Sequence, residues 1–95
     1  MLPENRIPTH PGEILLKEFL QPLRLTHAIL AKHIGMPARQ VDEIIRRKRS
    51  VTPRTAWLLA QAFGTSPEFW ANLQIAFDLA KSQPKRQAKR LQKAG

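Results

Sequence analysis

The stretch THAILAKHIGMPARQVDEIIRR, residues 26–47, places two short helical patterns on either side of a glycine. Thr26 can cap the first helix, and Gly35 suits the left-handed backbone that ends it because glycine has no Cβ. Ala31 is small, so the second helix can approach closely. A steep crossing would be fixed by the apolar side chains of Leu30, Ile34, Met36, Val41 and Ile44. The combination predicts a helix-turn-helix motif over residues 26–46; the alternative is an ordinary helical hairpin.

Prolines mark the starts of the later helices. Pro37, Pro53 and Pro67 each stand at a predicted first helical position, where the missing N–H is tolerated. Thr52 and Ser66 can cap the helices that begin at Pro53 and Pro67. No stretch alternates apolar and polar residues as a strand does, so we expect an all-α domain. The apolar spacing predicts five helices, over residues 11–20, 26–34, 37–47, 53–63 and 67–81.

Length and charge suggest one domain with a basic extension. The 95 residues suffice for a single domain, which we place at residues 10–81, after a flexible segment at 1–9. The formal net charge is +9, and six basic but no acidic side chains lie within residues 81–95. We expect residues 82–95 to form a mobile tail. Such basic density indicates a polyanionic partner, although a solvated surface would also carry it.

Composition excludes several other classes of protein. The chain has no cysteine, so it can form neither disulfides nor thiolate metal sites. No apolar run approaches the roughly 20 residues that span a bilayer. The first nine residues lack the apolar stretch of a signal peptide. We therefore expect a cytoplasmic protein without a membrane partner.

The second helix of the motif is the one expected to enter the major groove. Val41, Ile44 and Ile45 point inward, and the polar side chains of this helix remain outside. A guanidinium suits guanine, an amide suits adenine, a carboxylate suits the cytosine amino group and a methyl group suits thymine. The side chains predicted to read base edges are Ala38, Arg39, Gln40 and Glu43.

Hydroxyl, imidazole and cationic groups surround this helix and are candidates for phosphate contacts. The free N–H groups at the start of the helix that follows add to them. For each single charge, the alternative is simple exposure to solvent. The predicted phosphate contacts are Thr26, His27, Arg46, Arg47, Lys48, Arg49, Ser50, Thr52 and Arg54.

The last helix carries more apolar residues than one neighbour can cover. Spare apolar area indicates a subunit interface, and a homodimer would place two recognition helices about 34 Å apart, one turn of DNA. The alternative is that this helix wraps the core of its own domain. Trp57 falls outside the apolar stripe of the preceding helix, which predicts an exposed or interfacial position. The predicted dimer interface comprises Phe69, Trp70, Leu73, Ile75, Phe77 and Leu79.

Two segments resemble a known family. HPGEILLKEFLQPL at 10–23 and RKRSVTPRTAWLLAQAFGTSPEFWANLQIAFDL at 47–79 are similar to HigA-type antitoxins, within the Xre/Cro-like helix-turn-helix group. The resemblance implies a five-helix, lambda-repressor-like fold and a HigB-like ribonuclease toxin as partner. It also implies a homodimer that represses its own operon. The basic tail after Pro84 is not part of the family's pattern.

Other functions fit the sequence less well. A hydrolase needs a nucleophile, a base and an orienting group, whereas His10, His27 and His33 are scattered and lack metal-ligand spacing. We therefore predict no enzyme activity, metal or cofactor. A pure protein-interaction module would leave the basic loop unused. A stand-alone Xre-type repressor without a toxin partner remains the alternative to the antitoxin.

Overall fold

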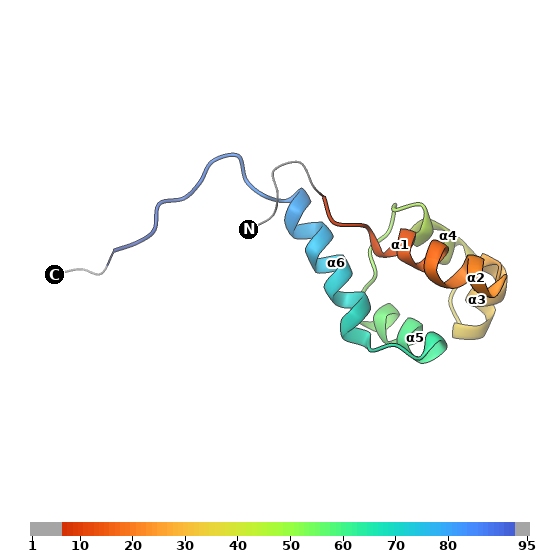
Figure 1. Ribbon diagram of the computed structural model, residues 1–95. Coiled ribbons are helices and arrows are strands. Elements are labelled where there is room, and N and C mark those ends of the chain that lie inside the picture. Colours follow the sequence, from red (N-terminus) through yellow and green to blue (C-terminus); the bar gives the residue numbers. More distant parts are fainter. Residues whose placement is uncertain (1–6, 93–95) are drawn as a thin grey trace.

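The computed structural model describes residues 7–92, and every regular element in that range is helical (Figure 1). The elements are α1 (Pro11–Ile14), the π-helical η1 (Leu15–Leu20), α2 (Gln21–Leu23), α3 (His27–Ile34), α4 (Ala38–Ile45), α5 (Pro53–Phe63) and α6 (Pro67–Lys81). α3 and α4 are the two helices of the predicted motif. α1 contacts α4 and α6, and α3 contacts α4 and α5. The predicted all-α fold class is confirmed.

The first helix continues past its predicted end. α1, η1 and α2 form one helical run up to Leu23, and Arg24 ends it with a φ of 56°. A proline inside an α-helix clashes with the carbonyl four residues earlier. In η1 the turns are wider, and the Gln21 N–H donates to the carbonyl of Leu16. Pro22 therefore fits within the helix, and the prediction that the helix stops before it is wrong.

The caps of α3, α5 and α6 are those the sequence predicts. Thr26, Thr52 and Ser66 each accept a hydrogen bond from a backbone N–H in the first turn of the helix that follows. Gly35 and Gly64 end α3 and α5 with φ values of 72° and 70°. Side chains with a Cβ rarely adopt this conformation. The predicted bounds of these three helices are confirmed, with Thr26 as a cap.

α4 is shorter at both ends than predicted. Pro37 has an extended backbone and is the N-cap, not the first helical residue. At the other end Arg47 has a φ of 64°, and the Lys48 N–H donates to the carbonyl of Glu43 at 2.8 Å. This bond, together with the bond from the Arg46 N–H to the Asp42 carbonyl, closes the helix after Ile45. Arg47 thus occupies the left-handed position that glycine often takes at the end of a helix.

Trp70 lies at the centre of the core, with none of its surface exposed. Its indole Nε1 donates to the Thr65 hydroxyl at 2.7 Å, and its ring centroid lies 5.2 Å from that of Phe19. The prediction that Trp70 belongs to a subunit interface is wrong, because the ring fills the interior of its own domain. The other buried apolar residues are Leu15, Leu20, Leu30, Ala31, Val41, Ile44, Ile45, Val51, Ala56, Leu59 and Ala60.

Gly12 lets α1 lie directly on α4. A Cβ at this position would collide with the carbonyl oxygen of Ile44. His10 caps the same helix, because its Nδ1 accepts a hydrogen bond from the Gly12 N–H at 2.9 Å. The His10 ring also meets the Phe77 ring edge-on, at 4.8 Å between centroids. The sequence predicted a close helix approach at Ala31 and missed this one.

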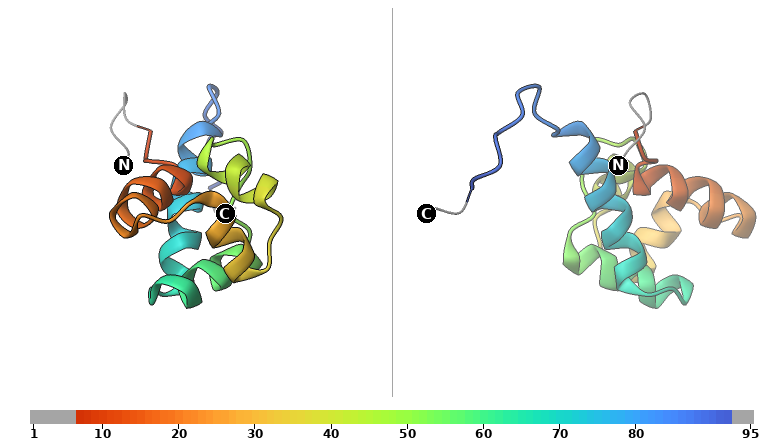
Figure 2. Two further views of the ribbon diagram at one scale, coloured as in Figure 1. Left: turned by 90° about the vertical axis from the view of Figure 1, so that its right-hand side faces the viewer. Right: turned by 60° about the vertical axis from the view of Figure 1, so that its left-hand side comes forward.

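Residues 82–92 leave the end of α6 without a helix and project away from the other elements (Figures 1 and 2). Their side chains are exposed. The mobility of the tail stays a prediction, and its last residues, 93–95, lie outside the described residues. Residues 1–6 of the predicted N-terminal segment also lie outside them. Between residues 7 and 92, no helix has both the length and the apolarity to cross a membrane.

Candidate nucleic-acid interface

The outer face of α4 forms a polar strip, which we name the recognition strip. Val41, Ile44 and Ile45 are buried on the inner face of α4, so their packing in the core decides which face of the helix points outward. Arg39 has 88% of its side chain exposed, so residues 7–92 leave this part of α4 open to a duplex. The recognition strip comprises the polar side chains of Arg39, Asp42 and Glu43, the Ala38 methyl beside them, and Arg46, the residue that follows the end of α4.

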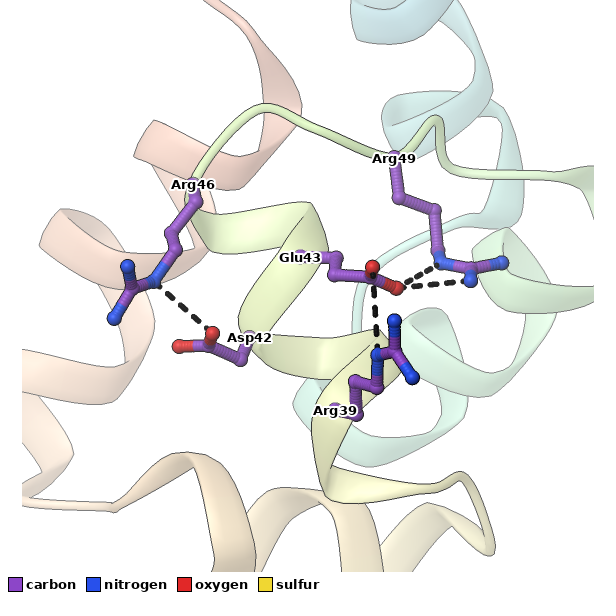
Figure 3. Close-up of polar contacts among 5 residues, drawn as sticks. All are labelled: Arg39, Asp42, Glu43, Arg46 and Arg49. Carbon is purple, nitrogen blue, oxygen red and sulfur yellow. Dashed lines mark hydrogen bonds and ion pairs between the residues drawn. The ribbon is translucent and has the colours of Figure 1, made fainter.

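Each of the two acidic residues in the recognition strip pairs with arginines (Figure 3). Glu43 accepts hydrogen bonds from the Nε and Nη2 of Arg49 at 3.0 and 2.9 Å, and lies 3.8 Å from the Nε of Arg39. Asp42 lies 3.0 Å from the Nε of Arg46. Exposed pairs of this kind contribute only about 0–1 kcal/mol. Arg39 and Arg46, each held by one such contact, can therefore exchange it for a phosphate or a base edge at little cost, whereas two hydrogen bonds hold Arg49.

The start of α3 lies along one side of the recognition strip. The Nδ1 of His27 is 3.2 Å from the Asp42 carboxylate, which joins the two helices of the motif. The Thr26 hydroxyl accepts a hydrogen bond from the Ile29 N–H at 3.1 Å. A helix start attracts anions because its free N–H groups and dipole are positive. Thr26, His27 and Arg46 therefore share one side of the site.

A polar hollow lies on the other side, between the starts of α4 and α5. Gln40 of α4 lines it, together with the hydroxyl of Thr52, which caps α5. The Thr55 N–H donates to that hydroxyl at 3.2 Å. The hollow thus gathers one predicted base contact with several predicted phosphate contacts. The phosphate candidates that line it are Arg49, Ser50, Thr52 and Arg54.

A buried glutamine, whose role was not predicted from the sequence, holds the loop between α4 and α5. The side-chain oxygen of Gln74 accepts a hydrogen bond from the Val51 N–H at 2.8 Å. Its amide nitrogen donates to Asp78 at 2.9 Å. Gln74 lies one helical turn after Trp70, on the inner face of α6. A polar residue at that buried register could have indicated that Gln74 needs a hydrogen-bond partner, but not that the partner is Val51.

One predicted phosphate contact, Arg47, belongs neither to the recognition strip nor to the lining of the hollow beside it. It follows the end of α4 and lies near His10. Burial lowers the pKa of His10, and the positive charge of Arg47 lowers that pKa further. Lys48, the next residue, is exposed. Arg46 and Arg49, by contrast, are both held by carboxylates of the recognition strip.

The exposed face of α6 is smaller than predicted. Phe69, Ile75 and Leu79 have 40%, 54% and 64% of their surfaces exposed. Leu73 and Phe77 are half-buried against their own domain. Trp57 of α5 is 58% exposed, which confirms that it lies outside the core.

The residues that the structure describes include no group of three histidine or acidic side chains placed to hold a metal ion. His27 pairs instead with Asp42, and His10 with the backbone of Gly12. The prediction that the protein needs no cofactor is not tested by this observation and stays a prediction.

Together these features define a helix-turn-helix domain, with α3 as its first helix and α4 as its exposed second helix. A family model described as helix-turn-helix matches residues 16–70. The antitoxin HigA-1 of Vibrio cholerae is 40% identical over 75 residues, which cover 79% of this chain and 70% of that protein.

Solved structures agree with this classification. The Pseudomonas aeruginosa antitoxin HigA, determined with the higBA promoter, has a TM-score of 0.77 and 40% identity, covering 79% of this chain and 82% of that one. The antitoxin GraA in complex with its operator has a TM-score of 0.85 and 34% identity, covering 98% of this chain and 100% of that one. The chain belongs to the HigA-type antitoxins of the Xre/Cro-like helix-turn-helix family.

Proposed function

We propose that the protein binds operator DNA through α4 and represses its own operon as the antitoxin of a toxin–antitoxin pair. One observation supports the proposal: the recognition strip is open, and polar and cationic side chains from α3, the α4–α5 loop and α5 lie along its sides. A duplex needs base-reading groups in the middle and positive groups on both sides. The cytoplasm, where the genome lies, is the expected location.

Base reading falls to the start of α4. We expect the guanidinium of Arg39 to bind guanine, the amide of Gln40 to bind adenine, and the Ala38 methyl to contact thymine. The groups on both sides of the strip would hold phosphates and set the position of α4 in the groove. We keep all nine predicted phosphate contacts, although Arg47 and Lys48 belong neither to the recognition strip nor to the lining of the hollow.

A homodimer would bring two recognition strips to adjacent turns of the duplex. We place its interface on the exposed face of α6, at Phe69, Ile75 and Leu79. Leu73 and Phe77 would form the inner edge of that interface. Exposed apolar side chains gathered on one helix are the feature that supports this assignment.

The test of DNA binding is a salt titration with the DNA upstream of the protein's own gene. Each neutralised phosphate releases counterions, so the five lysine and arginine contacts predicted for one protomer would give a slope of about −4.5 for log K against log salt concentration. A steep negative slope supports the proposal. A flat response would show that the arginines around α4 do not bind phosphate.

The toxin partner follows from the family and needs its own test. We expect the product of the adjacent reading frame to be a HigB-like ribonuclease that arrests growth. Co-expression of this protein should restore growth, and the two proteins should co-purify. If operator binding holds but no adjacent toxin exists, the protein is a stand-alone repressor.

A further inference from the structure

We propose that Glu43 positions Arg49 for a phosphate contact and does not itself read a base. The inference deepens the proposed function and rests on it. Glu43 lies in the middle of the recognition strip, where a carboxylate could accept a hydrogen bond from cytosine. Its contacts point to a different role, because they join the strip to the α4–α5 loop (Figure 3).

Both oxygens of the Glu43 carboxylate face arginines. Oε1 accepts hydrogen bonds from the Nε and Nη2 of Arg49, at 3.0 and 2.9 Å. Oε2 lies 3.8 Å from the Nε of Arg39. The Glu43 side chain is also only 26% exposed, compared with 88% for the Arg39 side chain. Cytosine would have to displace an arginine to reach it, whereas Arg39 stands open.

The same contacts leave one end of Arg49 available. A guanidinium carries five N–H donors, and Glu43 engages two of them along one edge. The N–H groups of the terminal edge remain for another acceptor. Arg49 lines the polar hollow beside Ser50 and Arg54, and 44% of its side chain is exposed. A phosphate at the mouth of this hollow would meet an arginine whose orientation is already fixed.

The direction in which the removal of Glu43 changes operator affinity separates this role from its alternatives. A carboxylate near phosphates repels them, so its removal should tighten binding if charge is its only effect. If Glu43 reads a base, its removal should change the preference at one base pair. If Glu43 positions Arg49, its removal should weaken binding to every sequence, and only when Arg49 is present.

The experiment compares Glu43→Ala, Arg49→Ala, the double variant and Glu43→Gln with the wild-type protein. We expect Glu43→Ala to lower operator affinity about three- to ten-fold and to reduce the magnitude of the salt slope by about 1, with base preference unchanged. The double variant should bind no more weakly than Arg49→Ala alone. Glu43→Gln keeps one acceptor oxygen for Arg49 and should fall between Glu43→Ala and the wild type. Glu68→Ala, on an exposed carboxylate of α6, is the matched control and should leave affinity unchanged.

Tighter binding by Glu43→Ala, a changed base preference, or additive losses in the double variant would each overturn the inference. Circular dichroism establishes whether each variant is folded; if Glu43→Ala is not, Glu43→Gln with Arg49→Ala completes the same comparison. A wild-type protein that shows no salt-dependent duplex binding would instead refute the proposed function.

Discussion

Replacement of Gly12 and replacement of Gly35 should destabilise the fold for different reasons. At Gly12 a new Cβ collides with the backbone of Ile44, so α1 must move away from α4. At Gly35 a new Cβ meets nothing within 4 Å, and the cost is the positive φ alone. We predict that Gly12→Ala lowers the free energy of unfolding by about 2–3 kcal/mol and Gly35→Ala by about 1 kcal/mol. Urea unfolding of both variants checks this order, and an equal or smaller effect at Gly12 would contradict it.

His10 makes the stability of the fold depend on pH. Burial and the nearby Arg47 lower its pKa from the ordinary 6.5, and its unprotonated Nδ1 accepts the Gly12 N–H. Below pH 6.5 the unfolded chain binds a proton that the folded chain does not. The free energy of unfolding should therefore fall as pH drops from 6.5 and level off once the folded protein is protonated too.

Thermal unfolding between about pH 7.5 and 5.5 measures this effect. His10→Asn keeps an oxygen acceptor for the cap and should flatten the pH dependence. His33→Asn, on an exposed histidine of α3, is the control and should keep it. The explanation fails if His10→Asn retains the full pH dependence of the wild type.

At the scale of single residues, helix caps and the turn glycine could be predicted from the sequence, whereas contacts between residues far apart in the chain could not. The caps at Thr26 and Thr52 and the turn at Gly35 depend on neighbours in the sequence, so the sequence alone indicates them. Gly12 and Gln74 matter because of partners 32 and 23 positions away, at Ile44 and Val51. No local pattern identifies such partners.

At the scale of elements, the contact between α6 and the α4–α5 loop depends on Gln74. Its replacement by alanine would leave the buried Val51 N–H without its acceptor. We predict that Gln74→Ala lowers the free energy of unfolding by about 1–3 kcal/mol. Hydrogen exchange at the Val51 amide should accelerate as well. Asn72→Ala, at an exposed site on the same helix, should change neither quantity; unchanged exchange at Val51 in Gln74→Ala would show that the loop is held by other contacts.

The helices themselves illustrate why bounds are predictable where caps are strong. α5 and α6 each begin at a proline that follows a capping hydroxyl, and their observed bounds are those predicted. The first helix was predicted to end before Pro22, yet η1 accommodates the proline by widening its turns. Arg47 ended α4 early in a conformation that sequence rules reserve mainly for glycine. Both departures arise from backbone geometry that side-chain patterns do not encode.

For the whole molecule, the exposed face of α6 is the feature that a dimer would bury. We predict that Ile75→Asp, which places a charge in that face, raises the dimer dissociation constant at least about ten-fold. Leu91→Asp makes the same kind of change in the tail, where Leu91 is 95% exposed, and should have no effect. Sedimentation velocity at micromolar concentrations measures both. Equal dimerisation by the two variants would place the interface elsewhere.

The site was predictable to a useful degree from the sequence. The sequence indicated which residues of α4 face outward, because the positions of Val41, Ile44 and Ile45 fix the inner face. It could not show that Arg49 binds Glu43, because no pattern in the sequence fixes the path of the chain between the end of α4 and Arg49. It also could not distinguish Trp70, which is core, from Phe69, which is partly exposed, because both lie in one apolar band.

The most direct test of the central claim is selection of bound duplexes from a random pool by the wild-type protein and by Arg39→Ala. If α4 reads base edges, the wild type should select a defined half-site. Arg39→Ala should lose preference at one base position of that site, at a cost of about 1–3 kcal/mol there. An unchanged preference with a uniform loss of affinity would make Arg39 a phosphate contact and contradict base reading by this residue.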